Sequence, residues 1–104
     1  MRVVTIIIDS PGSERAKNAL SIVEEASKLG ATVSLYLLGN GVYLGTKGFL
    51  ERVEPGVEVY ARKEDLEARG IRGDLLSERV RHPPNVLDRM IHEIMEEADR
   101  VLCF

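Results

Sequence analysis

The chain has 104 residues, of which 44% are hydrophobic and 30% charged, and its formal net charge is −3 at pH 7. This length predicts one domain over residues 1–104, large enough to bury a core without disulfides. The negative charge gives no electrostatic basis for direct nucleic-acid or anionic-membrane binding, and a single cysteine excludes an internal disulfide or a multi-cysteine metal site. The apolar run at the start is too short for a signal peptide or a membrane span, so we expect a cytoplasmic protein.

The first part of the chain predicts a strand, a helix and a second strand. The nearly unbroken β-branched run Val3–Ile8 is typical of a central parallel strand buried on both faces. After a turn, Glu14–Leu29 has apolar residues at helical spacing between a capping Ser13 and a terminating Gly30. The inward face of this helix is expected to consist of Ala16, Leu20, Val23, Ala26 and Leu29. A second apolar strand is predicted over Thr32–Leu38.

The middle of the chain predicts a second helix and then a strand that leads into a third. A glycine-rich break opens the second helix, which is expected to reach about Val53 with Leu44 and Leu50 also facing inward. The stretch Val57–Ile71 starts with the alternating polarity of a strand, turns helical at Lys63 and stops at Gly70.

Two acidic residues, Glu64 and Asp65, occupy the first turn of that third helix, where they favour the positive end of its dipole. Arg62 then lies where a strand meets a helix, at the sheet edge where ligands and reactive groups collect in α/β proteins.

The last third predicts a short fourth strand at Val80, a helix that begins after Asn85, and a final strand over Val101–Phe104. Asp88 is expected to complete a capping box with Asn85. The apolar face of this last helix is predicted to consist of Val86, Leu87, Met90, Ile91, Ile94 and Ala98. Strands that alternate with helices imply right-handed crossovers. The sequence therefore predicts a single doubly wound α/β domain with a four- or five-stranded, mostly parallel sheet.

Three stretches, two that follow the first two predicted strands and one that includes the third strand and its helix, carry a family resemblance. They are Ser10–Pro11, Gly41–Tyr43 with Lys47–Gly48, and Val59–Tyr60 followed by Glu64–Gly70. Together they resemble the DsrE/DsrF/DsrH superfamily of sulfur-relay proteins, and most closely the DsrH branch, whose counterpart in bacterial tRNA thiolation is TusB. The resemblance implies a flavodoxin-like sheet, a cytoplasmic location, and a homo-oligomer or a hetero-oligomer with DsrE/DsrF-like (TusD/TusC-like) subunits.

Relays of this kind pass persulfide sulfur towards 2-thiouridine at the tRNA wobble position, or act in dissimilatory sulfur oxidation. In DsrE and TusD subunits the sulfur-carrying cysteine stands where the third strand meets its helix, and the count back from Arg69–Gly70 places Arg62 there. DsrH-type proteins also lack a cysteine at that position. The resemblance thus implies a subunit that supports persulfide transfer and is non-catalytic itself. We expect no cofactor.

Two other family features are missing from the chain. Some DsrH members carry a cysteine in the first helix, and the branch usually ends in a Trp-containing segment, whereas this chain has neither. An oligomer is nonetheless expected from the residues as well, because Val42, Leu44 and Phe49 near the loops suggest an uncovered apolar patch.

Candidate binding residues gather at the predicted strand ends: Ser10, Asn40, Gly41, Tyr43, Arg62 and Lys63. A guanidinium at a helix start suits a carboxylate, a phosphate or a partner's persulfide, although a solvated charge beside Glu64 is the simpler interpretation. The loop glycines have neither Walker nor dinucleotide spacing, so tight turns explain them more simply than a phosphate cradle. These residues support a second hypothesis, a small-ligand or anion-binding module that uses the strand-end loops.

Cys103 is the only thiol and the one weak catalytic candidate. Its alternation with Val101 in a terminal strand favours burial and an inert thiol, because free cysteine is often buried. Its place near the carboxyl end of a strand supports a third hypothesis, a sulfurtransferase that uses Cys103. Exposure of this thiol would distinguish the third hypothesis from the first.

His82 and His92 have no partners at metal-ligand spacing, so no metal site is predicted.

Overall fold

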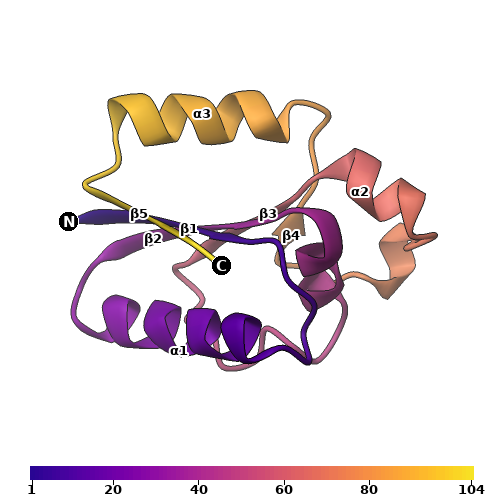
Figure 1. Cartoon of the computed structure of the whole chain (residues 1–104), viewed down its shortest axis with the longest axis horizontal. Coiled ribbons are helices and arrows are strands. Elements are labelled where there is room, and N and C mark those ends of the chain that lie inside the picture. The colour runs from indigo at the N-terminus through magenta and orange to yellow at the C-terminus, as the bar shows by residue number, and fades with distance from the viewer.

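Five parallel strands form the centre of the molecule, in the order β4-β3-β2-β1-β5 (Figure 1). The computed structural model describes all residues from 1 to 104. The strands are β1 (Arg2–Ile7), β2 (Thr32–Leu37), β3 (Glu58–Ala61), β4 (Val80–Arg81) and β5 (Arg100–Cys103). The helices are α1 (Glu14–Lys28), α2 (Lys63–Ala68) and α3 (Val86–Glu96), with two 3₁₀-helices, η1 (Gly39–Gly45) and η2 (Gly73–Leu75). The prediction of a parallel α/β sheet with helices between strands is confirmed.

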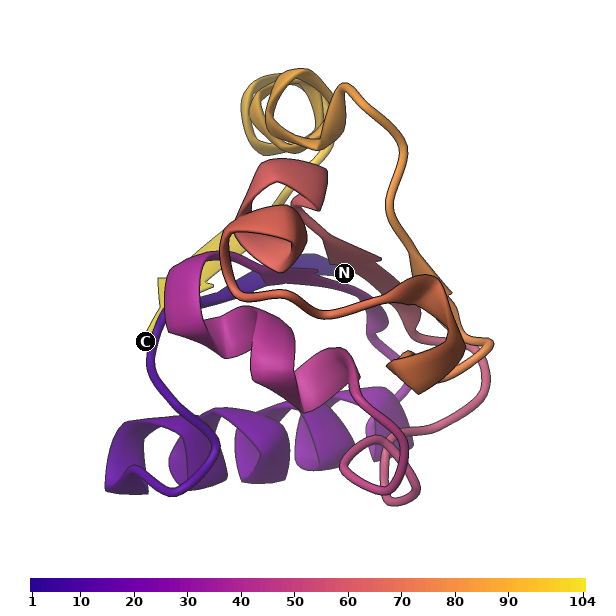
Figure 2. The ribbon, with the colours of Figure 1, turned by 90° about the vertical axis from the view of Figure 1, so that its right-hand side faces the viewer.

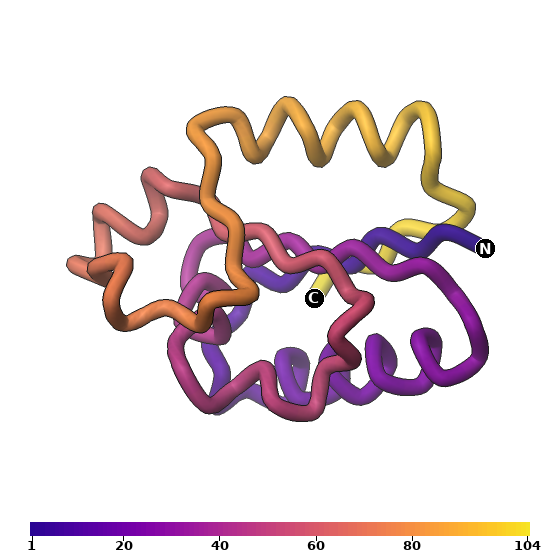
Figure 3. The backbone as a smooth tube through the Cα atoms, turned by 180° about the vertical axis from the view of Figure 1, so that it is seen from behind, coloured from indigo at the N-terminus to yellow at the C-terminus, as the bar shows by residue number.

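The two faces of the sheet are covered by different helices (Figure 1). Helix α1 connects β1 to its neighbour β2 on one face, while α3 crosses the other face to carry the chain from β4 to β5, beyond β1 (Figures 1 and 2). The first and last strands therefore lie side by side, as Figure 3 shows from behind. As predicted, β1 is an interior strand, and its residues Val3 to Ile7 are all buried.

The hydrophobic core is unequal on the two faces. Alternate residues of each strand point to opposite faces, so Val3 and Ile7 join a cluster of 18 buried residues on the α1 side. Val4 and Ile6 belong to a cluster of only five on the α3 side. Only Val86 of α3 is fully buried in this cluster, while Met90 and Ile94 pack against it partly buried, so polar contacts acquire a larger role on that face.

The second helix is much shorter than predicted. Only the 3₁₀-helix η1 forms, and the chain from residue 46 to 57 is irregular, although Leu50 and Val53 do face the core. Gly48 has φ +106°, which no helix accommodates. The guanidinium of Arg79 replaces helical hydrogen bonds by donating to four backbone oxygens at 2.6–3.3 Å, those of Leu50, Val53, Glu54 and Val57.

Three smaller predictions about individual residues are wrong. Leu29 is 86% exposed instead of facing the core, because α1 ends at Lys28 and Leu29 is the residue that caps the helix end. Asn85 stands at the start of α3 but its side chain makes no capping hydrogen bond, so the capping box with Asp88 does not form. Val42 and Leu44 are buried against the core, so they do not form the uncovered apolar patch that was predicted near the loops, although the separate prediction that Leu44 faces inward is confirmed.

Candidate functional site

The carboxyl ends of β1 and β5 border a shallow cavity of about 390 Å³. Its lining consists of Ile8, Asp9, Arg15, Asn40, Cys103 and Phe104. One thiol, one carboxylate, one guanidinium and one amide therefore face a common space at the end of the sheet where α/β proteins commonly bind ligands. Of the six predicted binding residues, this cavity contains only Asn40.

The thiol of Cys103 is exposed, so the prediction that it is buried is wrong. The residue lies opposite Ile6 in the register of β5 on β1. Because β5 is the last strand of the sheet, no further strand covers its outer side. Val101, two residues earlier and therefore on the same face of the strand, is also 44% exposed. The spacing of the two residues therefore does not imply burial in an edge strand.

A second cluster of polar side chains joins the end of β2 to helix α2. The carboxylate of Asp65 accepts a hydrogen bond from the backbone N–H of Gly39 at 2.9 Å, and Arg69 donates through Nε to Asn40 at 3.0 Å. Arg69 also lies 3.7 Å from the Asp65 carboxylate. The long side chain of Arg69 therefore folds back along α2 and reaches the loop after β2.

Arg62 occupies the junction of β3 and α2, as predicted, where it is the residue that precedes the first turn. Its guanidinium lies 3.4 Å from Glu64 and 3.5 Å from Asp65, and its side chain is 34% exposed. The Nε–H is enclosed and donates no hydrogen bond. Lys63 lies 4.0 Å from Glu67, one turn along the same helix. Both cations are thus oriented towards carboxylates of α2 and not into the cavity beside Cys103.

The other predicted binding residues lie in loops, where their contacts are explained by the fold alone. Gly41 donates its N–H to the backbone oxygen of Ile8 at 3.0 Å, and a Cβ placed on it would come within 2.0 Å of the Ile7 oxygen. Ser10 accepts the N–H of Ser13 through its backbone, and Tyr43 is partly exposed at 37%. The six predicted residues are therefore divided among separate strand ends and do not share one cleft.

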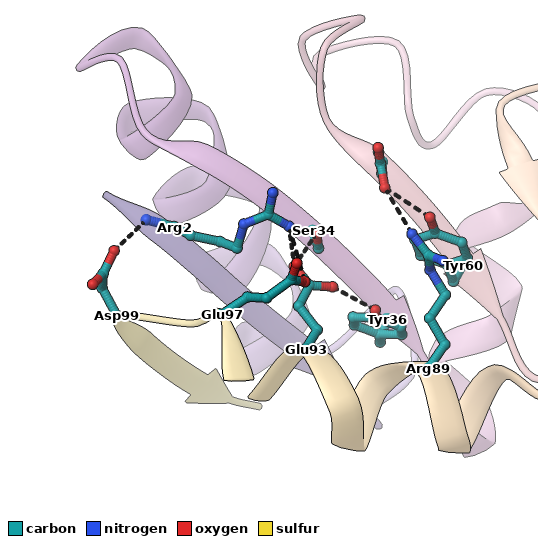
Figure 4. A network of polar contacts seen from close by, with 9 residues as sticks. Arg2, Ser34, Tyr36, Tyr60, Arg89, Glu93, Glu97 and Asp99 are labelled. Atoms are coloured by element: carbon teal, nitrogen blue, oxygen red, sulfur yellow. Dashed lines mark hydrogen bonds and ion pairs between the residues drawn. The ribbon is translucent and has the colours of Figure 1, made fainter. Parts of the chain in front are cut away.

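The sequence analysis missed a polar network under α3, which Figure 4 shows. Glu93 is 2% exposed, and its carboxylate accepts hydrogen bonds of 2.6 Å from both Ser34 and Tyr36 of β2. Arg2 of β1 donates to the same carboxylate at 3.1 Å and lies 3.6 Å from Glu97. Burial raises the pKa of the Tyr36 phenol far above its usual value, and the hydrogen bond to Glu93 makes the next largest contribution in the same direction.

The network continues towards β3 through stacked aromatic rings. The rings of Tyr36 and Tyr60 are 5.1 Å apart, and the guanidinium of Arg89 lies 4.6 Å from the Tyr60 centroid. Tyr60 donates to Glu58 at 2.7 Å, and this hydrogen bond, followed by the charge of Arg89, lowers the pKa of the Glu58 carboxyl. A sequence signal existed: Glu93 falls on the apolar face of α3, where an acidic residue needs buried partners.

No cluster of three or more His, Cys, Asp or Glu side chains gathers as a metal site. None of the helices is long and apolar enough to cross a bilayer. The groups present at the strand ends are one exposed thiol, guanidinium groups, carboxylates and an amide.

Comparisons with known proteins identify the same architecture. The family described as "DsrH like protein" matches residues 10–82. The crystal structure of the ychN protein from E. coli is 25% identical over 100% of both chains, with a TM-score of 0.80. Protein MTH1491 of unknown function, from Methanobacterium thermoautotrophicum, is 20% identical over 97% of both chains, with a TM-score of 0.78.

The solution structure of protein Tm0979 from Thermotoga maritima also shares the fold. It is 18% identical, with a TM-score of 0.61 over 92% of this chain and 99% of the other. No significant match is found among curated proteins.

Proposed function

This chain belongs to the DsrH-like family, and from that premise we propose that it is a cytoplasmic subunit of a sulfur-relay complex. In this proposal the subunit supports persulfide transfer, towards tRNA wobble 2-thiouridine or in sulfur oxidation, and does not carry the sulfur itself. Its partners are DsrE/DsrF-like subunits or further copies of the chain. The observation that carries the proposal is the strand–helix junction at Arg62, where the related thiol-bearing subunits hold their cysteine and this chain has an arginine.

The geometry at Arg62 supports docking in preference to chemistry. A thiol at a helix start beside cations would have a lowered pKa and would suit sulfur transfer, but this junction contains no sulfur. The guanidinium is instead one-third exposed and fixed by Glu64 and Asp65. A partner carboxylate or persulfide can join this arrangement as an additional anion on the exposed side of the guanidinium.

The proposal predicts that Arg62→Ala weakens binding of a DsrE/DsrF-like partner about tenfold or more. A shielded charge-assisted hydrogen bond contributes ~1.5–3 kcal/mol, and ~1.4 kcal/mol is a factor of ten in affinity. Binding is measured by titration calorimetry with the partner subunit from the same cell. The matched control is Arg72→Ala, because Arg72 is 75% exposed and also lies near a carboxylate, that of Asp74 at 3.3 Å. Equal, small losses from both substitutions would remove the docking role.

The exposed cavity beside Cys103 favours a second candidate function, in which the chain carries sulfur itself. The thiolate of Cys103 would attack the terminal sulfur of a donor persulfide, the donor's S–S bond would break, and the donor would leave as a thiolate. This exchange needs no oxidant or reductant. Arg15 lines the same cavity, and its positive charge would favour the binding of an anionic persulfide there.

One measurement decides between the two functions. The protein is incubated with a cysteine desulfurase and cysteine under native conditions, and its intact mass is then determined. The relay-subunit proposal predicts no added sulfur on this chain, together with faster sulfur transfer onto a DsrE-like partner when the chain is present. A gain of one sulfur atom that disappears in Cys103→Ser would establish the second function in place of the first.

A further inference from the structure

The cavity beside Cys103 lies where the chain changes its direction across the sheet. From β1 the chain passes through β2 and β3 to β4 on one side, and it then returns to place β5 on the other side of β1. Helix α1, which follows β1, and helix α3, which precedes β5, cover opposite faces (Figure 1). In open α/β sheets, ligands bind outside the carboxyl ends of the strands at such a switch point. The strand order therefore indicates this cavity as a ligand site independently of its side chains.

Two opposite charges line the cavity and are not neutralised by protein groups. Arg15, in the first turn of α1, is exposed and forms no ion pair or side-chain hydrogen bond. One carboxylate oxygen of Asp9 accepts the N–H of Ser10 at 3.1 Å, whereas the other accepts no hydrogen bond and the group forms no ion pair. A ligand that carries both an ammonium and a carboxylate group would satisfy the two charges together.

Asn40 contributes a third polar group, whose orientation is fixed from outside the cavity. Its side-chain oxygen accepts a hydrogen bond from Nε of Arg69 at 3.0 Å. The guanidinium of Arg69 is itself held, because it donates to the backbone oxygen of Asp65 at 3.1 Å. The NH₂ group of Asn40 is consequently left free to donate. A guanidinium and an amide donor at one cavity suit the two oxygens of a single carboxylate.

The rest of the lining is apolar and firmly held. The backbone of Phe104 donates to Ile6 at 2.8 Å and accepts from Ile8 at 2.7 Å, which fixes this wall to β1. The side chain of Ile8 is 49% exposed and would be covered by an apolar group of a ligand. The volume of about 390 Å³ falls at the small end of the range of ligand pockets, ~300–1,000 Å³. The ligand is therefore small, with one short apolar group beside its two charges.

We propose that this cavity binds a free α-amino acid with a small apolar side chain. The ligand carboxylate contacts Arg15 and the NH₂ group of Asn40, and its ammonium group contacts Asp9. Its side chain lies against Ile8 and Phe104. A simple anion would leave the carboxylate of Asp9 unpaired beside it, and a simple amine would leave Arg15 unpaired. This inference does not rest on the proposed function, because it involves neither the docking of a partner nor the transfer of sulfur.

The first test is a titration of the full chain with L-alanine, followed by NMR. So small a ligand is expected to bind with a dissociation constant of ~1 mM. The side-chain NH₂ signals of Asn40 should shift and saturate as L-alanine is raised to about 50 mM, roughly fifty times that constant. Acetate and methylammonium, which carry one charge each, should give no saturable shift. No saturation with L-alanine, or equal binding of acetate, would overturn the proposal.

The thiol of Cys103 reports whether the ligand occupies this cavity. Because this thiol lines the cavity and is the only one in the chain, its alkylation by iodoacetamide can be followed by intact mass. At about 50 mM L-alanine nearly all of the protein is occupied, and alkylation should slow at least about fivefold. The same concentration of methylammonium acetate should leave the rate unchanged. An unchanged rate with L-alanine would show that the amino acid does not bind in this cavity.

Two substitutions test the separate charges. Arg15→Met and Asp9→Asn should each weaken L-alanine binding about tenfold or more, because each removes one charge-assisted contact. Asparagine still offers an oxygen to the N–H of Ser10, so the loop is expected to keep its conformation. The matched control is Lys17→Met, at an exposed cation of α1 outside the lining, which should bind L-alanine as the unaltered chain does. Equal affinities of Arg15→Met and Lys17→Met, or an unchanged affinity of Asp9→Asn, would contradict recognition of both charges.

Discussion

A single buried carboxylate, that of Glu93, determines how α3 is held on the sheet. It is the only acidic side chain among the buried residues, and it satisfies Ser34, Tyr36 and Arg2 together. Removal of one partner of a buried charged contact is costly, because the groups left behind remain shielded from water and have lost their hydrogen bonds. On a face whose apolar cluster has five residues, this polar contact fixes the position of the helix.

Replacement of Glu93 is expected to destabilise the protein strongly. Glu93→Ala leaves two buried hydroxyls without an acceptor and should lower the free energy of unfolding by about 3 kcal/mol. The control is Glu96→Ala, on the exposed side of the same helix, where a change within ~0.5 kcal/mol is expected. Urea denaturation followed by circular dichroism measures both. Losses of equal size would mean that the network contributes nothing beyond helix propensity.

At the scale of elements, the close approach of η1 to β1 positions the strand-end loops. Gly41 lies against the backbone of Ile7 and donates to Ile8, which sets the place of Asn40 in the cavity beside Cys103. The same loop is tied to α2 through Asp65 and Arg69. The β1 and β2 ends and α2 are thus coupled by backbone packing and by a few charged hydrogen bonds.

Gly41→Ala is predicted to disrupt this arrangement. A methyl group 2.0 Å from the Ile7 oxygen forces the backbone apart, and such overpacking costs about 2 kcal/mol or more. Gly12→Ala is the matched control, because no atom lies within 4 Å of its added methyl group; it should be neutral or slightly stabilising. Thermal unfolding distinguishes the two variants. A fully stable Gly41→Ala would show that η1 can move away from β1 without loss.

On the scale of the whole molecule, the two faces of the sheet differ in their dependence on pH. The α1 face is held by a large apolar cluster, whereas the α3 face depends on hydrogen bonds that the phenols of Tyr36 and Tyr60 donate to Glu93 and Glu58. Burial raises the pKa of both phenols, and a hydrogen bond raises it further, to Glu93 in the case of Tyr36 and to Glu58 in the case of Tyr60. The stability of the fold should consequently respond to alkaline pH through this face.

The sign of the alkaline effect follows from the direction of these shifts. A phenol whose pKa is higher in the folded state contributes its full stability below the unfolded pKa of ~10 and loses it as the pH rises towards the folded value. The free energy of unfolding should therefore decline above pH ~10. Tyr36→Phe should reduce this slope, whereas Tyr43→Phe, at a partly exposed tyrosine, should retain it. Urea unfolding at a series of alkaline pH values measures the slopes, and equal slopes in the two variants would contradict the assignment.

The sequence by itself determined the order and type of most elements, because hydrophobic periodicity, β-branched runs and turn glycines act locally. Val3–Ile8 predicted the interior strand, Gly70 has the expected positive φ of +65°, and Val80 lies in a short strand. The residue pattern also carried the family resemblance. The position of Arg62 at the end of β3 follows from the same local pattern.

Only the tertiary structure decided which of these residues are exposed, paired or brought together. Cys103 is exposed because its strand forms the edge of the sheet, a fact that depends on strand order and not on alternation. Arg69 and Asn40 meet, and Glu93 is buried with Ser34 and Tyr36, through contacts between residues 29 to 59 positions apart. Local patterns carry no information about such distant partners, because the partners are chosen by the way the sheet and its helices pack.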